Sequence, residues 1–194
     1  MKRMLSFLLL FALIACSNVF AQQFESPSLA YGFSAGGATG DNSNADKWVV
    51  QYRGYLQYRL ISHHVLGQAG LGYTKLRASG VYTADIVTLD NRFLFIPFSL
   101  PNVNPYLYAG FGVAKDLNKG QSYMPMIPFG VGMQTRLSER VMLQINAGYN
   151  LVLSDKLSET KSTGSDRNTF TNGKHDGFYG FLLGLTFTFP GSTD

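Results

Sequence analysis

Hydrophobic and polar residues alternate with a period of two along most of the chain, which is typical of β-strands that present two different faces. The clearest segment runs from Trp48 to Leu60, with tryptophan, valine, tyrosine and leucine on one face and mainly glutamine, arginine and tyrosine on the other. Similar segments lie at about 29–36, 65–74, 92–100, 106–113, 127–137, 143–151 and 179–189. The phase of 92–100 stays open because both of its faces are apolar around Pro97. The pattern predicts eight strands.

The connections between these segments are predicted to alternate in length. Tight turns are expected near 61–63, 101–104 and 138–140, and long polar loops at 38–47, 77–90, 115–123 and 154–176. Short turns at one end and long loops at the other are typical of bacterial outer-membrane barrels. The predicted fold is therefore all-β, an eight-stranded antiparallel transmembrane up-and-down β-barrel with both termini on the short-turn side.

The composition of the polar face decides which face points inward. A soluble lipocalin-like barrel, the alternative fold, needs a charged exterior, but only 14% of the residues are charged, against about 25% in ordinary soluble domains. We therefore expect the apolar face to contact lipid and the polar face to fill the lumen. The residues expected in the lumen are Gln51, Arg53, Tyr55, Gln57, Arg59, Gln134, Arg136, Gln144 and Asn146. The arginines are expected to lack acidic partners on the strands, because Asp90 is assigned to a loop edge.

The N-terminus has the features of a secretory signal peptide, with basic Lys2 and Arg3 before an apolar stretch at 5–15. We favour cleavage after Ala21, which gives a signal peptide at 1–21 and a barrel domain at 22–194. A lipobox-like sequence ending at Cys16 is the alternative, in which this cysteine carries lipid. Export together with the strand pattern predicts location in the bacterial outer membrane.

Little in the sequence indicates chemistry. The single cysteine and three histidines show no metal-ligand spacing, and the glycine pairs are not followed by a helix or a phosphate-loop sequence. Without Lys2 and Arg3 the net charge falls from +4 to +2, which is too small and too evenly spread to indicate nucleic-acid binding. We expect no catalytic residue, no metal and no cofactor. The pair His175 and Asp176 supports only a third alternative, a barrel enzyme that acts on lipid or peptide.

The end of the strand region, from Leu182 to Phe189, has a glycine followed by two alternating aromatic residues. With the segment from Pro105 to Gly112, it resembles the small outer-membrane β-barrel family that includes the OmpA membrane domain and OmpX. The resemblance covers about 29–189. It implies that Gly184, Phe187 and Phe189 form the signal read by the barrel-assembly machinery, which would be a partner during biogenesis.

These observations lead to an expected function. The protein is predicted to be non-enzymatic, with a side-chain-filled lumen and a structural or surface-interaction role. Its expected partners are outer-membrane lipid and an unidentified surface ligand at the four long loops. A narrow channel for small solutes or anions is the main alternative, because arginines are expected in the lumen.

Overall fold

The computed structural model describes residues 27–41, 48–62, 64–78, 82–98, 100, 102–118, 123–154 and 176–189. The predicted signal peptide at 1–21, Cys16, His63, His175 and most of the loop at 154–176 lie outside these residues. The strands are β1 (Leu29–Gly40), β2 (Val49–Ser62), β3 (Val65–Ala78), β4 (Tyr82–Phe95), β5 (Val103–Asp116), β6 (Met124–Arg136), β7 (Val141–Val152) and β8 (Asp176–Thr188). Within the described residues, no helix is long and apolar enough to cross a membrane.

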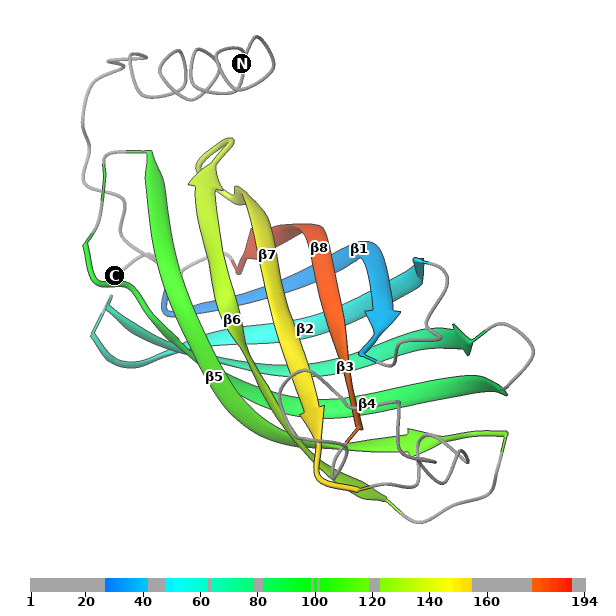
Figure 1. Ribbon diagram of the computed structural model, residues 1–194. Helices are drawn as coiled ribbons and strands as arrows, with labels where there is room; N and C mark the ends of the chain where they lie inside the picture. The colour runs from blue at the N-terminus through cyan, green and yellow to red at the C-terminus, as the bar shows by residue number, and fades with distance from the viewer. Residues whose placement is uncertain are drawn as a thin grey trace, which may run out of the picture.

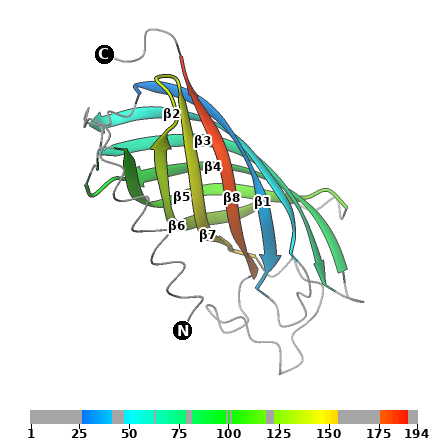
Figure 2. The same ribbon diagram turned by 90° about the horizontal axis from the view of Figure 1, so that it is seen from above.

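The eight strands form one closed antiparallel barrel in which each strand pairs with its neighbours in the chain. Closure is made by β1 and β8, which come from opposite ends of the strand region and lie side by side in both views (Figures 1 and 2). Their register runs from Ala30 opposite Thr188 to Gly40 opposite Phe178. The predicted eight-stranded up-and-down barrel is confirmed.

The fourth strand differs from its prediction. It spans Tyr82–Phe95 rather than 92–100, so residues 77–90 are not a long loop and only 79–81 connect β3 with β4. The sequence pattern fails here because its polarity is inverted. Asp85 lies on the outward phase of the strand, whereas Ala84 and Ile86 are fully buried inside. The strand ends before Pro97, which has no backbone N–H to donate to a neighbouring strand.

The remaining connections need smaller corrections. The predicted loops at 38–47 and 115–123 lose their first residues to β1 and β5, and Asn104 belongs to β5 rather than to a turn. The turn at 138–140 is as predicted, closed by hydrogen bonds from Leu137 N (2.9 Å) and Ser138 N (3.1 Å) to the Val141 carbonyl. The β7–β8 connection is by far the longest, because β7 ends at Val152 and β8 begins at Asp176.

Large apolar side chains cover the outside of the barrel. The predicted phase holds on the clear segments, so that odd-numbered residues of β1 and β8 point outward and their even-numbered neighbours point inward. The exposed outward side chains include Phe33, Val50, Leu56, Leu71, Leu89, Leu107, Phe111, Val131, Phe181 and Leu183. Exposure of this surface to water would be unfavourable, because each such side chain is about 1.5–3 kcal/mol less stable in water than when it is buried.

Tyrosines cross glycines on neighbouring strands. On the outer wall, the Tyr58 ring from β2 lies where a side chain on Gly67 of β3 would be. Its hydroxyl donates a 3.0 Å hydrogen bond to Asn91 Oδ1 on β4. Near the long-loop end, Tyr149 of β7 similarly lies over Gly177 of β8 and donates to Asp41 Oδ2 at 2.7 Å, just beyond β1. Each tyrosine thus ties together three consecutive strands around the barrel.

We predict that Gly67→Ala lowers the free energy of unfolding by about 1–2 kcal/mol, because the new methyl group displaces the Tyr58 ring and breaks its hydrogen bond to Asn91. Gly54→Ala is the matched control, since no atom lies within 4 Å of a Cβ placed there. The measurement is urea unfolding of protein reconstituted in lipid vesicles. Equal midpoints for the two variants would contradict the role given to Tyr58.

Candidate functional site

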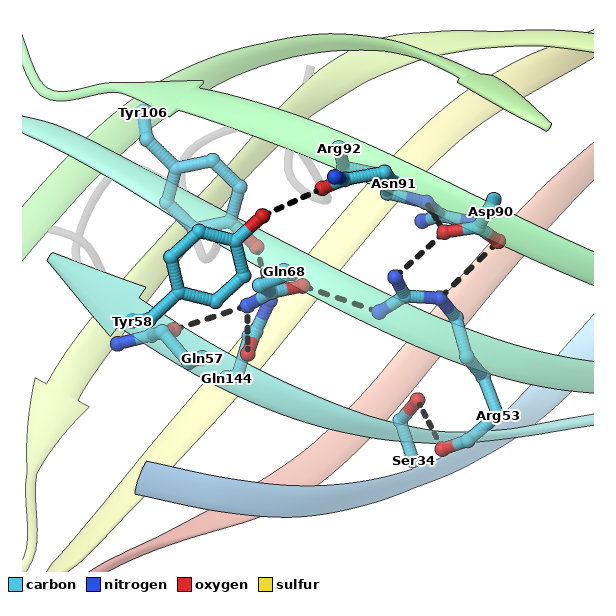
Figure 3. Close-up of polar contacts among 10 residues, drawn as sticks. All are labelled: Ser34, Arg53, Gln57, Tyr58, Gln68, Asp90, Asn91, Arg92, Tyr106 and Gln144. Carbon is cyan, nitrogen blue, oxygen red and sulfur yellow. Dashed lines mark hydrogen bonds and ion pairs between the residues drawn. The ribbon is translucent and has the colours of Figure 1, made fainter. Parts of the chain in front are cut away.

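A buried ion cluster occupies the middle of the lumen. Asp90 of β4 lies between Arg53 of β2 and Arg92 of β4 (Figure 3). Arg53 contacts both carboxylate oxygens, with Nη2 2.6 Å from Oδ1 and Nε 3.3 Å from Oδ2. Arg92 Nε donates to Oδ1 at 3.1 Å and Nη2 to Oδ2 at 3.3 Å. All three residues are at most 4% exposed. The carboxylate neutralises only one of the two guanidinium groups, so the cluster carries a formal charge of +1.

Two tyrosine rings complete the surroundings of the arginines. The Arg53 guanidinium carbon lies 5.1 Å from the centre of the Tyr55 ring, and that of Arg92 lies 5.0 Å from the centre of the Tyr108 ring. Cation–π contacts of this kind are worth more when water is excluded. The second positive charge is therefore stabilised by ring faces and amide groups rather than by a second acid.

A chain of amide and hydroxyl groups extends the cluster toward the short-turn end (Figure 3). Arg53 Nη1 donates to Gln68 Oε1 at 3.0 Å, and Gln68 Nε2 donates to Gln57 Oε1 at 2.9 Å. Gln57 Oε1 also accepts from Gln134 Nε2 at 2.7 Å. These bonds cross the lumen from β2 to β6. They join side chains that are far apart in the sequence, such as Gln57 and Gln134.

Gln144 of β7 connects the remaining strands to this chain. Its Oε1 accepts hydrogen bonds from Tyr55 (2.6 Å) and Gln68 (3.3 Å), and its Nε2 donates to the Tyr106 hydroxyl at 2.6 Å. Tyr55 also reaches Thr186 Oγ1 of β8 at 2.7 Å. With the Ser34 hydroxyl of β1 donating to the Arg53 carbonyl at 3.2 Å, every strand of the barrel contributes to the lumen network.

The structure places all nine predicted lumen residues on the inward phase of their strands. Seven are buried, namely Gln51, Arg53, Tyr55, Gln57, Gln134, Gln144 and Asn146. Arg59 and Arg136 are only half-buried. They lie two residues beyond Gln57 and Gln134, respectively, toward the short-turn end, so they border the lumen mouth rather than its centre.

The expectation that the arginines lack acidic partners is wrong. Asp90 is not at a loop edge but in the middle of the lumen, where it contacts two arginines. Arg92 and Gln68 were also not among the predicted lumen residues. Asp90 and Arg92 are two residues apart and therefore share a face of the strand. The pattern is hard to recognise because the apolar Leu94 lies on the same inward face, whereas the polar Asn91 lies on the outward face with Leu89 and Phe93.

The end of the lumen near the long loops is mainly apolar, with the buried Asp116 as an exception, and the sequence pattern does not predict this. A buried cluster there joins Ala38, Leu76, Ala84, Ile86, Ala114, Met124, Met126, Val152 and Phe178. These side chains come from seven of the eight strands. The polar network is therefore separated from the long-loop end by packed hydrocarbon rather than by a continuous polar passage.

The three residues predicted as an assembly signal lie on β8 or directly after it. Phe187 and Phe189 point outward, with ring centres 5.4 Å and 5.1 Å from that of Tyr31 on β1. Gly184 faces inward, where a side chain would collide with Ser34 and the Phe33 carbonyl. Phe187 and Phe189 thus form an aromatic group with Tyr31 at the seam where the barrel closes.

Among the described residues, the side chains that can bind a metal ion include one histidine, His64. No group of three His, Cys, Asp or Glu side chains in those ranges is placed to hold a metal ion. His64 is half-buried after β2, with Nδ1 2.9 Å from the Ile96 carbonyl oxygen. It joins two connections at the short-turn end.

Comparison with solved structures shows a likeness to known barrels. The chain is similar to Neisserial surface protein A, with a TM-score of 0.58 and 15% identity over 84% of this chain and 97% of that chain. A barrel from the de novo design of transmembrane β-barrels aligns with a TM-score of 0.42 and 14% identity over 86% of this chain and 98% of that chain. No family model and no curated protein matches the chain. The likeness to the neisserial protein shows the fold, whereas membership of the OmpA and OmpX family stays a prediction.

We predict that Asp90→Asn destabilises the folded barrel by about 3–5 kcal/mol, because it leaves two buried guanidinium groups without a counter-charge. Asp85→Asn is the control. It removes the partly exposed partner of Lys75, 3.2 Å away, and should cost no more than about 1 kcal/mol. Urea unfolding of both variants in lipid vesicles measures the difference. Similar losses for the two variants would mean that the lumen cluster contributes little.

Proposed function

We propose that this protein is an exported barrel of the bacterial outer membrane, and that it acts as a structural or surface-interaction protein rather than as an enzyme or an open pore. The observation that carries the proposal is the filled lumen. Arg53, Gln57 and Gln134 are at most 2% exposed inside it. A barrel whose outside is apolar and whose inside is occupied offers its loops as the surface for contact with a partner.

Membrane insertion is supported by the outer wall. Its middle carries aliphatic and phenylalanine side chains such as Leu71, Leu89 and Phe111, all more than half exposed. Closure also pairs the backbone groups of β1 with those of β8, which hydrocarbon requires because no water is present to satisfy them. The signal peptide at 1–21 supplies the route of export. The similar neisserial barrel is by its name a surface protein.

The channel for small solutes or anions is the second candidate, and the net positive ion cluster favours it. An anion that entered the lumen would meet Arg53 and Arg92. Against this candidate stand the apolar cluster at the long-loop end and the hydrogen bonds that hold both arginines. A conduction path would need both to rearrange.

The loops offer the remaining site for function. The segment at 154–176 contains lysines, an arginine and acidic residues among glycine, serine and threonine. It is too polar to form its own core. We propose that it extends outside the cell and, with the shorter connections at 41–48 and 117–123, contacts the partner. The barrel-assembly machinery would act earlier, through Gly184, Phe187 and Phe189.

We expect no stable conductance from the folded wild-type protein in a planar lipid bilayer at neutral pH, because side chains fill an eight-stranded lumen. A double variant, Met124→Ala with Phe178→Ala, tests the apolar end. If that end closes the lumen, brief openings should appear in the variant alone. Steady anion-selective current through the wild type, lost in Arg53→Met, would instead establish the channel.

The surface role predicts that protease added to intact cells cleaves within 154–176 while the rest of the barrel stays protected and folded. Deletion of 157–172 should leave the barrel folded, so that unheated protein still runs faster on a gel than heated protein, which is the heat-dependent gel shift. The deletion should also reduce binding of intact cells to the surface ligand at least tenfold. Cells that carry an epitope inserted at the turn 138–140 are the control, because this turn faces the periplasm. Labelling of that epitope from outside would contradict the topology.

A further inference from the structure

One stretch of the outer wall combines a groove with basic side chains. At the long-loop ends of β2 and β3, a groove of about 380 Å³ is lined by Trp48, Val49, Val50, Tyr52, Tyr73 and Lys75. Trp48 is 64% exposed. Its ring lies over Gly37 of β1, where an added Cβ would be 2.8 Å from the ring. The groove therefore has an aromatic wall on one side and opens outward.

The register of the strands orders these residues by depth. Tyr52 is directly opposite Tyr73. Lys75 lies two residues beyond Tyr73, on the same face and nearer to the long loops. Below the tyrosines, Gly54 pairs with Leu71, and Leu71 with Leu89. The wall thus changes from aliphatic to aromatic to basic toward the long-loop end, as it does where a barrel passes from hydrocarbon into headgroups.

Basic side chains outnumber the acid at this level. Lys75 Nζ lies 3.2 Å from Asp85 Oδ1, and the lysine side chain is 41% exposed against 19% for the aspartate. On the other side of β4, Lys115 lies opposite Val87, with Nζ 5.1 Å from the centre of the Tyr123 ring. The two lysines and Asp85 carry a formal charge of +1. An ammonium group has three N–H donors, so Lys75 can bind Asp85 and a second anion together.

We propose that this part of the wall, the groove with Lys75 and Lys115, binds an anionic lipid of the outer leaflet through a phosphate headgroup. Its phosphate lies against the two ammonium groups at the depth of Trp48 and Val50. An acyl chain runs from there along Tyr52 and Tyr73 toward Leu71. Asp85 positions Lys75 and weakens its hold on the phosphate. The inference depends on the proposed membrane insertion and commits to lipid as the occupant, because the site combines charge with an apolar groove.

The protein carries its own probe, since Trp48 is its single tryptophan. The mature full-length protein is folded into phosphatidylcholine vesicles that contain a minor fraction of lipid with dibrominated acyl chains, which quench nearby tryptophan. That lipid is either phosphatidic acid, with a phosphate headgroup, or phosphatidylcholine. We expect brominated phosphatidic acid to quench Trp48 with a higher apparent affinity than brominated phosphatidylcholine, by about fivefold for each lysine contact. Inorganic phosphate should not reduce this quenching.

Variants assign the effect to the site. Lys75→Gln with Lys115→Gln should abolish the preference for phosphatidic acid, whereas Asp85→Asn should increase it. Arg140→Gln, which removes an exposed charge at the short-turn end, should leave the preference unchanged. Equal quenching by the two brominated lipids in the wild type, or a preference that survives in the lysine variant, would overturn the inference, as would competition by inorganic phosphate.

The heat-dependent gel shift is recorded on the same vesicles. A normal shift without lipid preference rejects the lipid site and leaves membrane insertion intact. Absence of the shift in the wild type rejects insertion and the lipid site with it. If the double lysine variant loses the gel shift, the single change Lys115→Gln replaces it. This change should reduce the preference for phosphatidic acid by the contribution of one lysine contact.

Discussion

The hydrogen-bonded pairing of β1 with β8 constrains everything else in this molecule. Once the sheet closes with eight strands, its interior has room for side chains but not for a wide channel. Inward positions away from the lumen mouth then become buried ones, and a charge there must find a partner within the barrel. Asp90 satisfies this requirement for Arg53 and Arg92, and the glutamines distribute the remaining hydrogen bonds among the other strands.

Glycine and tyrosine make that packing possible. Tyr55 passes over Gly32 inside the barrel, and Tyr106 passes over Gly132. In each case the absent side chain lets a ring lie flat across the neighbouring strand, so that its hydroxyl reaches farther around the wall. Tyr58 repeats the arrangement on the outside with Gly67. Close approach by side chains thus explains Gly32, Gly67 and Gly132, whereas backbone atoms of a neighbouring strand lie nearest to Gly36, Gly110 and Gly112.

The interior is divided along the barrel axis, and this division bears on function. The polar network lies in the middle and toward the short turns, where a second apolar group includes Leu66, Leu94 and Ile96. A larger apolar cluster occupies most of the long-loop end. An apolar end excludes water and strengthens the ion cluster behind it, because charges interact more strongly at low dielectric. The same arrangement supports the proposed scaffold, with its loops and lipid-facing wall, over the alternative of a channel.

The number of strands, their antiparallel order and the outward phase of most of them follow from the sequence, because a period of two with apolar residues on one face fits only a sheet with one face in an apolar environment. The candidate site was predicted in part for the same reason, since Arg53, Gln57 and Gln144 lie on clear polar faces. Tertiary structure decided the course of β4 and the partner of the arginines. Asp85 faces outward because Lys75 is opposite it, and Ile86 faces inward because the lumen there is apolar. Such exceptions depend on contacts between strands, and the alternation of residues along a single strand contains no information about those contacts.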